Sequence, residues 1–307
     1  MIDVSIIIVN YNTLHFVKPC VDSIVEQTKD IDYEIIVVDN GSTDGSCEVL
    51  RKDKRLVFLP IGKNVGFGRA NNYGFRNAAK GEYVFFLNSD TILVNNAIKQ
   101  MYDFARQYEG KVGALGCVLE DLEGHPIHSY GPFPKMSDDW MKLLIAPIQK
   151  GLHLYKAKPF VWPDTWMKVD YITGADLFVS KSVLETCGLF NPAFFMYYEE
   201  TELELRFAKK GYDNILLAGP RIIHLEGGSA KNTQTSQFFR DNFRQQKSEY
   251  IYYKLTEPKW KYLLFRVFHP ILRQTLWFNP NVSFADKLSI MKQLFVPVNI
   301  TGYENID

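Results

Sequence analysis

Four apolar segments, each ending in a polar turn, recur near the start of the chain. Their composition predicts buried strands at residues 4–9, 33–38, 56–59 and within 81–91, with helical spacing between them. Alternation of strands and helices produces right-handed crossovers, so these strands form a largely parallel sheet with helices on both faces. The polar turns then lie along one edge of the sheet, where open α/β sheets bind their ligands.

Composition narrows the class of protein. The chain has 307 residues, 46% of them apolar, which is enough for one large domain, with or without an appendage. Its formal net charge of +0 gives no general attraction to nucleic acid, so no nucleic-acid partner is predicted. The N-terminus lacks the pattern of a signal peptide. Four widely spaced cysteines fit reduced thiols better than disulfides or a zinc site and predict a cytoplasmic protein: Cys20, Cys47, Cys117 and Cys187.

The fourth predicted strand ends in polar residues that can bind a ligand. Asn88 and Asp90 are two residues apart, so an extended backbone points both side chains to the same side. Oxygen ligands in this arrangement suit a hard divalent cation and the phosphates that it carries. The alternative is an ordinary strand followed by an Asx turn or a helix cap.

A dinucleotide-binding oxidoreductase is the general alternative for such a sheet. Its fingerprint requires a glycine-rich turn directly after the first strand, whereas residues 10–13 contain no glycine. Gly66 and Gly68 follow the third strand instead, where a glycine pair indicates only a tight turn. The sequence therefore disfavours this class.

Several segments together resemble one known family. Their order and spacing are similar to those of family 2 glycosyltransferases, most closely the bacterial rhamnosyltransferase-like branch. The resemblance implies a GT-A fold and transfer of a sugar from a nucleotide diphosphate donor, with inversion at the anomeric carbon. The segments that carry it are residues 5–12, 37–45, 64–72, 87–91, 173–176, 194–200 and 222–229.

The resemblance also assigns residues to the nucleotide sugar. Tyr11 matches the position whose ring packs on the nucleobase. Asp39 matches the acid that accepts the imide N–H of uracil or thymine, which implies a UDP- or dTDP-sugar donor. Each residue has a simpler interpretation as part of a turn. Arg69 and Asn72 are predicted to contact donor phosphate, because they lie near a helix start. Asp176 is predicted to contact the donor sugar or the acceptor. Further donor contacts are predicted at Asn88, Ser89 and Asp90.

A divalent metal, Mn²⁺ or Mg²⁺, is implied as cofactor. Asp90 matches the family's metal-binding carboxylate, and the metal bridges the donor phosphates and neutralises the leaving diphosphate. His224 matches a downstream histidine that completes the site in many GT-A enzymes; the alternative is a structural histidine. Asn88 stands where the family motif has a second aspartate, which leaves one carboxylate and implies a modest metal affinity.

Glu200 is the predicted catalytic base. Direct displacement needs a carboxylate that takes the proton from the acceptor hydroxyl. The family keeps an acidic pair in this region, and Glu200 aligns with its second member, while Glu199 is predicted to orient the acceptor or the backbone. Adjacent carboxylates and flanking aromatic rings tend to raise a pKa. The alternative is that these acids only stabilise the first turn of a helix.

The predicted domain organisation has two parts. A GT-A domain covers 1–230, divided into a nucleotide-binding half at 1–120 and an acceptor and catalytic half at 121–230. A helical extension follows at 231–307. Its segment 255–280 is aromatic and basic but too interrupted to span a bilayer. We expect this segment either to lie in a membrane interface, at the inner face of the plasma membrane, or to close a core or form a homodimer contact.

These observations predict an inverting hexosyltransferase in the synthesis of bacterial surface polysaccharide of the cell envelope. The candidate donors are UDP- and dTDP-sugars, including dTDP-L-rhamnose, and the acceptor is a glycan or a lipid-linked glycan. Prolines and tryptophans in residues 124–168 are expected near the acceptor. The alternative is a catalytically silent subunit that binds sugar nucleotides or acts as a scaffold.

Overall fold

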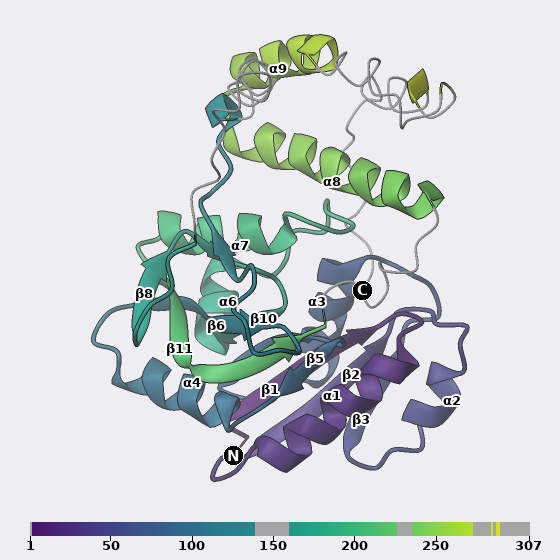
Figure 1. Cartoon of the computed structure of the whole chain (residues 1–307), viewed down its shortest axis with the longest axis vertical. Helices are drawn as coiled ribbons and strands as arrows, with labels where there is room; N and C mark the ends of the chain where they lie inside the picture. Colours follow the sequence, from purple (N-terminus) through teal and green to yellow (C-terminus); the bar gives the residue numbers. More distant parts are fainter. Residues whose placement is uncertain (1, 139–159, 226–234, 273–283, 285–286, 289–307) are drawn as a thin grey trace. The chain divides into compact units, whose positions relative to one another are not determined.

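The computed structural model describes residues 2–138, 160–225, 235–272, 284 and 287–288 (Figure 1). The chain divides into two compact units. The first consists of Met1–Phe133 and Val161–Asn232, and the second of Pro134–Phe160 and Thr233–Asp307. Much of the irregular segment 124–168, and residues 273–280 of the predicted interfacial segment, lie outside the described residues.

Strands and helices alternate over residues 4–88 of the first unit, as predicted from the apolar segments. The helices are α1 Leu14–Gln27, α2 Ser46–Leu50, α3 Phe67–Ala78, α4 Ala97–Gln107, α6 Lys181–Cys187 and α7 Glu199–Lys209. The strands are β1 Val4–Asn10, β2 Tyr33–Asp39, β3 Leu56–Pro60, β4 Tyr83–Asn88, β5 Thr91–Leu93, β6 Val112–Glu120, β7 Tyr130–Gly131, β8 Trp166–Val169, β9 Tyr171–Ile172, β10 Asp176–Ser180 and β11 Asp213–His224.

The main sheet has the strand order β3-β2-β1-β4-β10-β6-β11-β5, with β8 paired to β11. The four strands predicted from the sequence, β1 to β4, pair in parallel. β10 is antiparallel to β4 and β6, and β5 is antiparallel to β11, so the complete sheet is mixed. Asn10 pairs with Asp39, and Val9 pairs with Asn88, which places the polar ends of three strands level at one edge.

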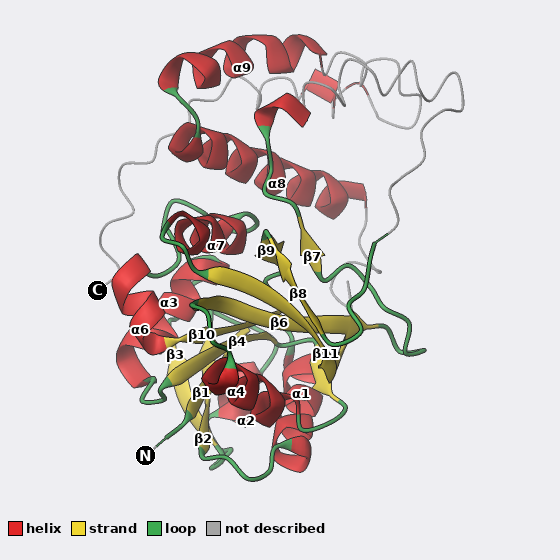
Figure 2. Cartoon of the chain, turned by 90° about the vertical axis from the view of Figure 1, so that its left-hand side faces the viewer, coloured by secondary structure: helices red, strands yellow, loops and turns green. Residues whose placement is uncertain are grey.

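Helices cover both faces of this sheet (Figure 2). Alternate residues of a strand point to opposite faces, and β1 shows this directly. Ile6 and Ile8 belong to the buried cluster that contains the apolar face of α1. Ile7, on the other face, lies against Gly74 of α3. Because both faces are buried, β1 is apolar from Ile6 to Val9, and its polar side chains, Ser5 and Asn10, lie near its two ends.

The start of α3 packs on the loop that precedes α7. The N–H of Phe67 donates to the carbonyl oxygen of Phe195 at 2.9 Å. Gly66 has φ +95°, and a Cβ atom built there would overlap the same carbonyl. Glycine therefore meets two requirements at this position, a left-handed backbone and a close approach between two segments.

We expect Gly66→Ala to destabilise the protein by about 2–4 kcal/mol, because it adds a backbone overlap to an unfavourable φ. Gly45→Ala is the matched control, since Gly45 has φ +86° but no atom within 4 Å of an added Cβ. That control should cost only about 1 kcal/mol. Urea denaturation of both variants measures the difference, and equal losses would contradict the packing argument.

The second unit contains α8 Thr235–Thr256 and α9 Lys259–Leu272, which pack against each other. The rings of Tyr250 and Tyr253 in α8 contact the ring of Phe265 in α9. The hydroxyl of Tyr250 and Nδ1 of His269 form a hydrogen bond of 2.6 Å. Among the described residues, no helix combines the length and hydropathy that crossing a bilayer requires.

Candidate active site

Asp39 organises the turn after β2. Its carboxylate accepts hydrogen bonds from the side chain of Asn10 at 2.8 Å, from the N–H groups of Gly41 and Ser42, and from the thiol of Cys47. Burial raises the pKa of Asp39, but these donors outweigh it, so the pKa lies below its ordinary value. Three of these donors share Oδ2, whereas Oδ1 accepts only the bond from Asn10. Oδ1 therefore keeps a lone pair that a further N–H donor could use.

Tyr11 and Ser89 lie in neighbouring turns at the same edge. Tyr11 follows β1 and is 46% exposed, so its ring is available to a flat ligand. Ser89 follows β4, and its hydroxyl lies 3.1 Å from the hydroxyl of Thr13. This contact joins the turn after β4 to the turn after β1. Nucleobase stacking by Tyr11 and donor binding by Ser89 stay predictions.

Asp90 and His224 lie together although they are far apart in sequence. Nε2 of His224 lies 3.4 Å from Oδ1 of Asp90 and 3.5 Å from the amide nitrogen of Asn88. The pairing of β5 with β11 sets this geometry, because Thr91 is the partner of His224 and the N–H of Leu225 donates to the backbone carbonyl of Asp90. Both side chains are partly exposed, at 18% for Asp90 and 14% for His224.

The Asp90–His224 pair fits two ligands of one divalent cation. A carboxylate oxygen and an imidazole nitrogen at this separation can bind the same ion, and this donor set is acceptable to Mn²⁺. Among the residues that the structure describes, no group of three His, Cys, Asp or Glu side chains converges on a metal position. Any ion held here would need further ligands from a bound molecule, such as the oxygens of a diphosphate.

Arg69 and Asn72 hold the loop before α7. The guanidinium of Arg69 donates to the carbonyl oxygen of Pro192, and to that of Val65 at 3.2 Å. The amide of Asn72 donates to the carbonyl of Phe190 at 2.8 Å and accepts from its N–H at 3.1 Å. Both side chains thus have a positioning role in the structure. Their predicted contacts with donor phosphate stay predictions.

The acidic pair begins α7 after two strained residues. Tyr197 and Tyr198 have φ of +70° and +68°, in the left-handed region that tyrosine rarely adopts. Such strain is retained where the surrounding structure fixes the backbone, and it commonly accompanies functional sites. The N–H of Glu202 donates to the carbonyl of Tyr198 at 2.9 Å and starts the first helical turn.

The two acids of the pair differ in access. Glu199 is 3% exposed, and burial, together with the charge of Glu200, raises its pKa well above the ordinary value. Glu200 is partly exposed and lies against Gly174, where an added Cβ would be 3.5 Å from its Cγ. Burial of its carboxyl raises the pKa of Glu200 to about 7. Glu200 is thus the member of the pair with exposed surface, and a carboxyl that titrates near neutral pH suits a general base.

Two further buried carboxyls lie behind this pair. Glu204, one helical turn after Glu200, accepts the N–H of Ile172 at 2.9 Å. Asp176 accepts the N–H of Cys117 at 2.6 Å. Both side chains are fully buried, and each has one oxygen without a hydrogen-bond partner among the described residues. Asp176 thus faces protein in the structure, and its predicted contact with donor sugar or acceptor stays a prediction.

Burial dominates the titration of both groups. Burial raises the pKa of Asp176 to about 7, although the bond from Cys117 opposes the shift. Burial also raises the pKa of Glu204 well above its ordinary value, and the charges of Glu200 and Asp176 add to this effect. The sequence reasoning did not single out Glu204. Its i,i+4 spacing from Glu200 was the available signal, since that spacing puts both on one helix face.

We expect Glu204→Gln to raise the free energy of unfolding at pH 8 by on the order of 1–2 kcal/mol. The folded-state pKa of Glu204 lies above its unfolded value, so its contribution to stability is complete at low pH and declines as pH rises. Glutamine does not titrate and can still accept the N–H of Ile172. Urea denaturation should show a smaller gain at pH 5.

Glu202→Gln is the matched control on the same helix. Glu202 is buried and pairs with Arg206 through both carboxylate oxygens at 3.0 Å, so removing its charge should lower stability at both pH values. A pH-independent effect of Glu204→Gln would contradict the protonated state assigned to Glu204.

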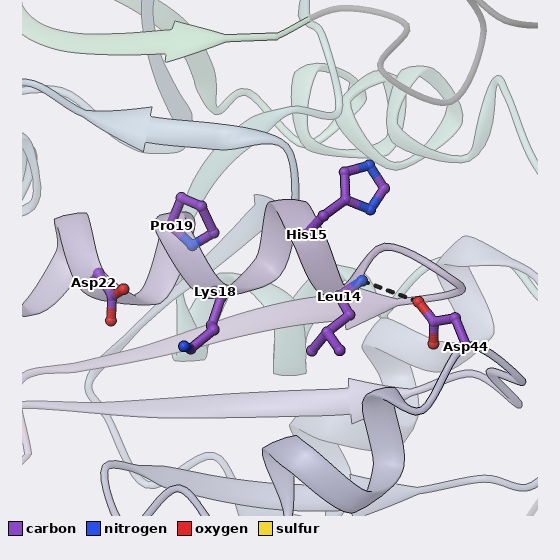
Figure 3. Close-up of a pocket in the computed structure, with 6 residues that line it drawn as sticks. All are labelled: Leu14, His15, Lys18, Pro19, Asp22 and Asp44. Carbon is purple, nitrogen blue, oxygen red and sulfur yellow. Dashed lines mark hydrogen bonds between the residues drawn. The ribbon is translucent and has the colours of Figure 1, made fainter.

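A shallow pocket of about 610 Å³ lies along the first half of α1 (Figure 3). Its lining residues are Leu14, His15, Lys18, Pro19, Asp22 and Asp44. Asp44 accepts the N–H of Leu14 at 3.1 Å, and Asp22 pairs with Arg55 at 2.8 Å. None of the predicted site residues lines this pocket, so it does not enter the assignment of the active site.

The fold and the site together define a class of protein. A sheet whose strand ends gather polar turns, an Asp–His pair and an accessible acid is the architecture of the GT-A nucleotide-sugar transferases. The chain belongs to glycosyl transferase family 2, whose family model matches residues 5–160. The predicted resemblance to this family is confirmed.

Two solved structures confirm the GT-A fold. The crystal structure of GalNAc-T7 with UDP, GalNAc and Mn²⁺ aligns with a TM-score of 0.55 and 14% identity, covering 82% of this chain and 50% of that chain. The crystal structure of S. aureus TarS 1-349 aligns with a TM-score of 0.52 and 14% identity, covering 95% of this chain and 70% of that one.

Curated relatives support the rhamnosyltransferase-like branch. The O-antigen biosynthesis protein RfbC of Myxococcus xanthus is 29% identical over 238 residues, which cover 74% of this chain but only 18% of the relative. An N-acetylglucosaminyl-diphospho-decaprenol L-rhamnosyltransferase of Mycobacterium tuberculosis is 25% identical over 235 residues, covering 71% of this chain and 73% of the relative. The chain thus spans less than a fifth of the first relative and about three quarters of the second.

Proposed function

We propose that this protein is an inverting glycosyltransferase that uses a nucleotide diphosphate sugar. The observation that carries the proposal is the approach of His224 to Asp90, at 3.4 Å, at the edge where the polar strand ends lie. This pair provides a place for the diphosphate and its cation. Family membership and the accessible acid at Glu200 support the same proposal.

Glu200 accepts the proton in the proposed reaction. The acceptor hydroxyl attacks the anomeric carbon from the face opposite the diphosphate and transfers its proton to the carboxylate of Glu200. The bond between the anomeric carbon and the diphosphate oxygen breaks, and the diphosphate leaves with the electron pair. Of the two predicted roles of Glu199, its burial favours orienting the backbone at the start of α7 over orienting the acceptor.

Asp90 and His224 would hold a divalent cation, Mn²⁺ or Mg²⁺. When bound, the ion supplies Lewis-acid stabilisation of the leaving diphosphate. The imidazole favours Mn²⁺ over Mg²⁺. The GalNAc-T7 structure has the same fold and contains Mn²⁺ and UDP, which supports the proposed binding of a cation.

The proposed donor is a UDP- or dTDP-sugar, and the acceptor is a glycan or a lipid-linked glycan in bacterial surface polysaccharide synthesis. dTDP-L-rhamnose is favoured among the donors because one relative is a rhamnosyltransferase that acts on a decaprenol-linked sugar. We place the enzyme in the cytoplasm, at the inner face of the plasma membrane. The four cysteines, all free thiols, support that compartment.

Thermal denaturation with nucleotide diphosphates tests the donor class. We expect UDP or dTDP with Mn²⁺ to raise Tm by several degrees, because a ligand that binds only the folded state stabilises it by mass action. GDP should have little effect, and the shift should shrink without Mn²⁺. An equal response to all nucleotides, with or without metal, would contradict the proposed site.

A transfer assay separates the proposal from its alternative. A catalytically silent subunit would show the thermal shift but neither transfer nor donor hydrolysis with a panel of UDP-, dTDP- and GDP-sugars. We expect hydrolysis or transfer with at least one UDP- or dTDP-sugar.

A further inference from the structure

Helix α9 has apolar side chains on two opposite faces. One face is buried in the second unit, where Tyr262, Phe265 and His269 lie at 8%, 0% and 2% exposure. This face packs on α8 through the ring contacts of Tyr250 with Phe265 and with His269. The core of the α8–α9 pair therefore accounts for Tyr262 and Phe265 but not for the exposed apolar residues of α9.

The opposite face of α9 carries a continuous apolar stripe in contact with solvent. Its residues are spaced i, i+3, i+4, i+7 and i+8, which places them on one side of a helix. Their exposed fractions lie between 44% and 62%, whereas large apolar side chains normally occur singly on a surface. We call this set the α9 stripe: Trp260, Leu263, Leu264, Val267 and Phe268.

Lysines flank the stripe on both sides. At 100° per residue, Lys259 lies about 100° to one side of Trp260 and Lys261 about 100° to the other, and both are exposed. Lys261 also lies over the ring of Trp260, at 5.8 Å from its centroid. The helix sequence contains no aspartate or glutamate. The α9 stripe is thus apolar along its length and has a lysine on each side at its N-terminal end.

We propose that the α9 stripe binds the surface of an anionic lipid bilayer, with α9 lying parallel to the membrane plane. Apolar side chains enter the boundary between headgroups and acyl chains, and the flanking lysines contact anionic headgroups. A tryptophan at one end of the stripe suits this depth, because its ring is amphipathic.

Charge favours a bilayer over a second copy of the chain. Pairing two α9 stripes would bury the apolar faces but would leave the lysines of each helix without an acidic partner on the other helix. The helix offers no acidic side chain to neutralise them. Glu257, just before α9, is already 3.7 Å from Lys261. Anionic headgroups supply the missing negative charge, so the bilayer is the better-matched partner.

Co-sedimentation with vesicles tests the proposal on the full chain without any sugar nucleotide. We expect the protein to pellet with phosphatidylcholine vesicles that contain phosphatidylglycerol at low salt, and to be released at high salt. Pure phosphatidylcholine vesicles should bind several-fold less protein. Absence of binding to the anionic vesicles would overturn the proposal but not the proposed transferase function, which the nucleotide-dependent thermal shift tests separately.

Substitutions in α9 test whether the α9 stripe is the part of the protein that binds the vesicles. Leu263→Gln with Val267→Gln should weaken partitioning by at least about tenfold, because two apolar side chains leave the interface. Lys259→Gln with Lys261→Gln should lose about fivefold per lysine. Matched controls are Leu122→Gln, at a residue 75% exposed in the first unit, and Lys52→Gln with Lys54→Gln, also exposed there. Both controls should bind like the wild type.

Tryptophan fluorescence tests directly whether the stripe enters the bilayer. Bilayer insertion should blue-shift the tryptophan fluorescence, and Trp260→Phe should remove most of this shift while the protein still pellets. Such a result supports insertion of the stripe, whereas an unchanged shift overturns it.

Sedimentation velocity tests whether the stripe instead binds a second copy of the chain. A wild-type dimer that becomes monomeric in the Leu263→Gln, Val267→Gln variant would overturn the membrane assignment in favour of self-association.

Discussion

Replacing Glu200 with glutamine is expected to lower kcat for sugar transfer by about 10²- to 10⁴-fold, because an amide cannot accept the proton of the acceptor hydroxyl. Glu200 is the partly exposed member of the acidic pair, whereas Glu199 is buried. The nucleotide-induced thermal shift should be unchanged, since glutamine preserves the size and the position of the side chain. Steady-state kinetics with saturating donor and acceptor measure the effect.

The pH profile gives an independent test of the same role. Burial raises the pKa of Glu200 to about 7, and only the ionised carboxyl can accept a proton. The rate of the wild-type enzyme should therefore fall about tenfold for each pH unit below 7. Glu202→Gln, which removes the acid paired with Arg206, should keep the rate within a few-fold and retain this profile. A Glu200→Gln enzyme with normal activity would exclude Glu200 as the base.

Replacing Asp90 with alanine should lower kcat/KM by about a hundredfold or more and abolish the response of the enzyme to Mn²⁺. Asp90 is the carboxylate of the Asp90–His224 pair, and a single imidazole holds a hard cation poorly. Asp103→Ala is the matched control, because Asp103 forms only a surface ion pair with Lys99. Activity should be measured across a Mn²⁺ titration and after treatment with a chelator.

Asn88→Asp tests the metal site in the opposite direction. The amide of Asn88 lies 3.5 Å from Nε2 of His224, so aspartate at this position would place a second carboxylate beside the pair. We expect half-maximal activity at a lower Mn²⁺ concentration than in the wild type. Full activity of Asp90→Ala in the presence of chelator would exclude a metal role for this residue.

Local composition predicted the four strands β1 to β4, which pair in parallel. Buried strands in a sheet with helices on both faces must be apolar on both sides, and β1, β2 and β4 show this as apolar runs at 6–9, 35–38 and 83–87. β10 lies antiparallel between β4 and β6, and β5 pairs with β11 from the far end of the unit. Such pairings depend on contacts distant in sequence, which periodicity does not encode.

The site residues also divide into features that the sequence predicts and features that depend on distant contacts. Family resemblance identified Asp90 and His224, but only the pairing of β5 with β11 shows why they meet. Arg69 near a helix start suggested phosphate binding, yet in the structure its guanidinium donates to the carbonyl of Pro192. Glu204 shows no sign of its burial in the sequence, because its surroundings come from β9 as well as α7. Residue types alone do not predict which backbone groups these side chains bind.

The place of β11 in the sheet sets when Asp90 and His224, the proposed cation ligands, can meet during synthesis. This strand comes last in the first unit, yet it lies between β6 and β5 and carries His224 to Asp90. During synthesis, the strands that carry Tyr11 and Asp39 emerge well before it, while β5 still lacks its partner. Long-range pairing of this kind forms slowly. A nascent or truncated chain that ends before residue 213 would have the turns after β1 and β2 but no His224 beside Asp90, so Mn²⁺ binding at the proposed site would report completed folding of this unit.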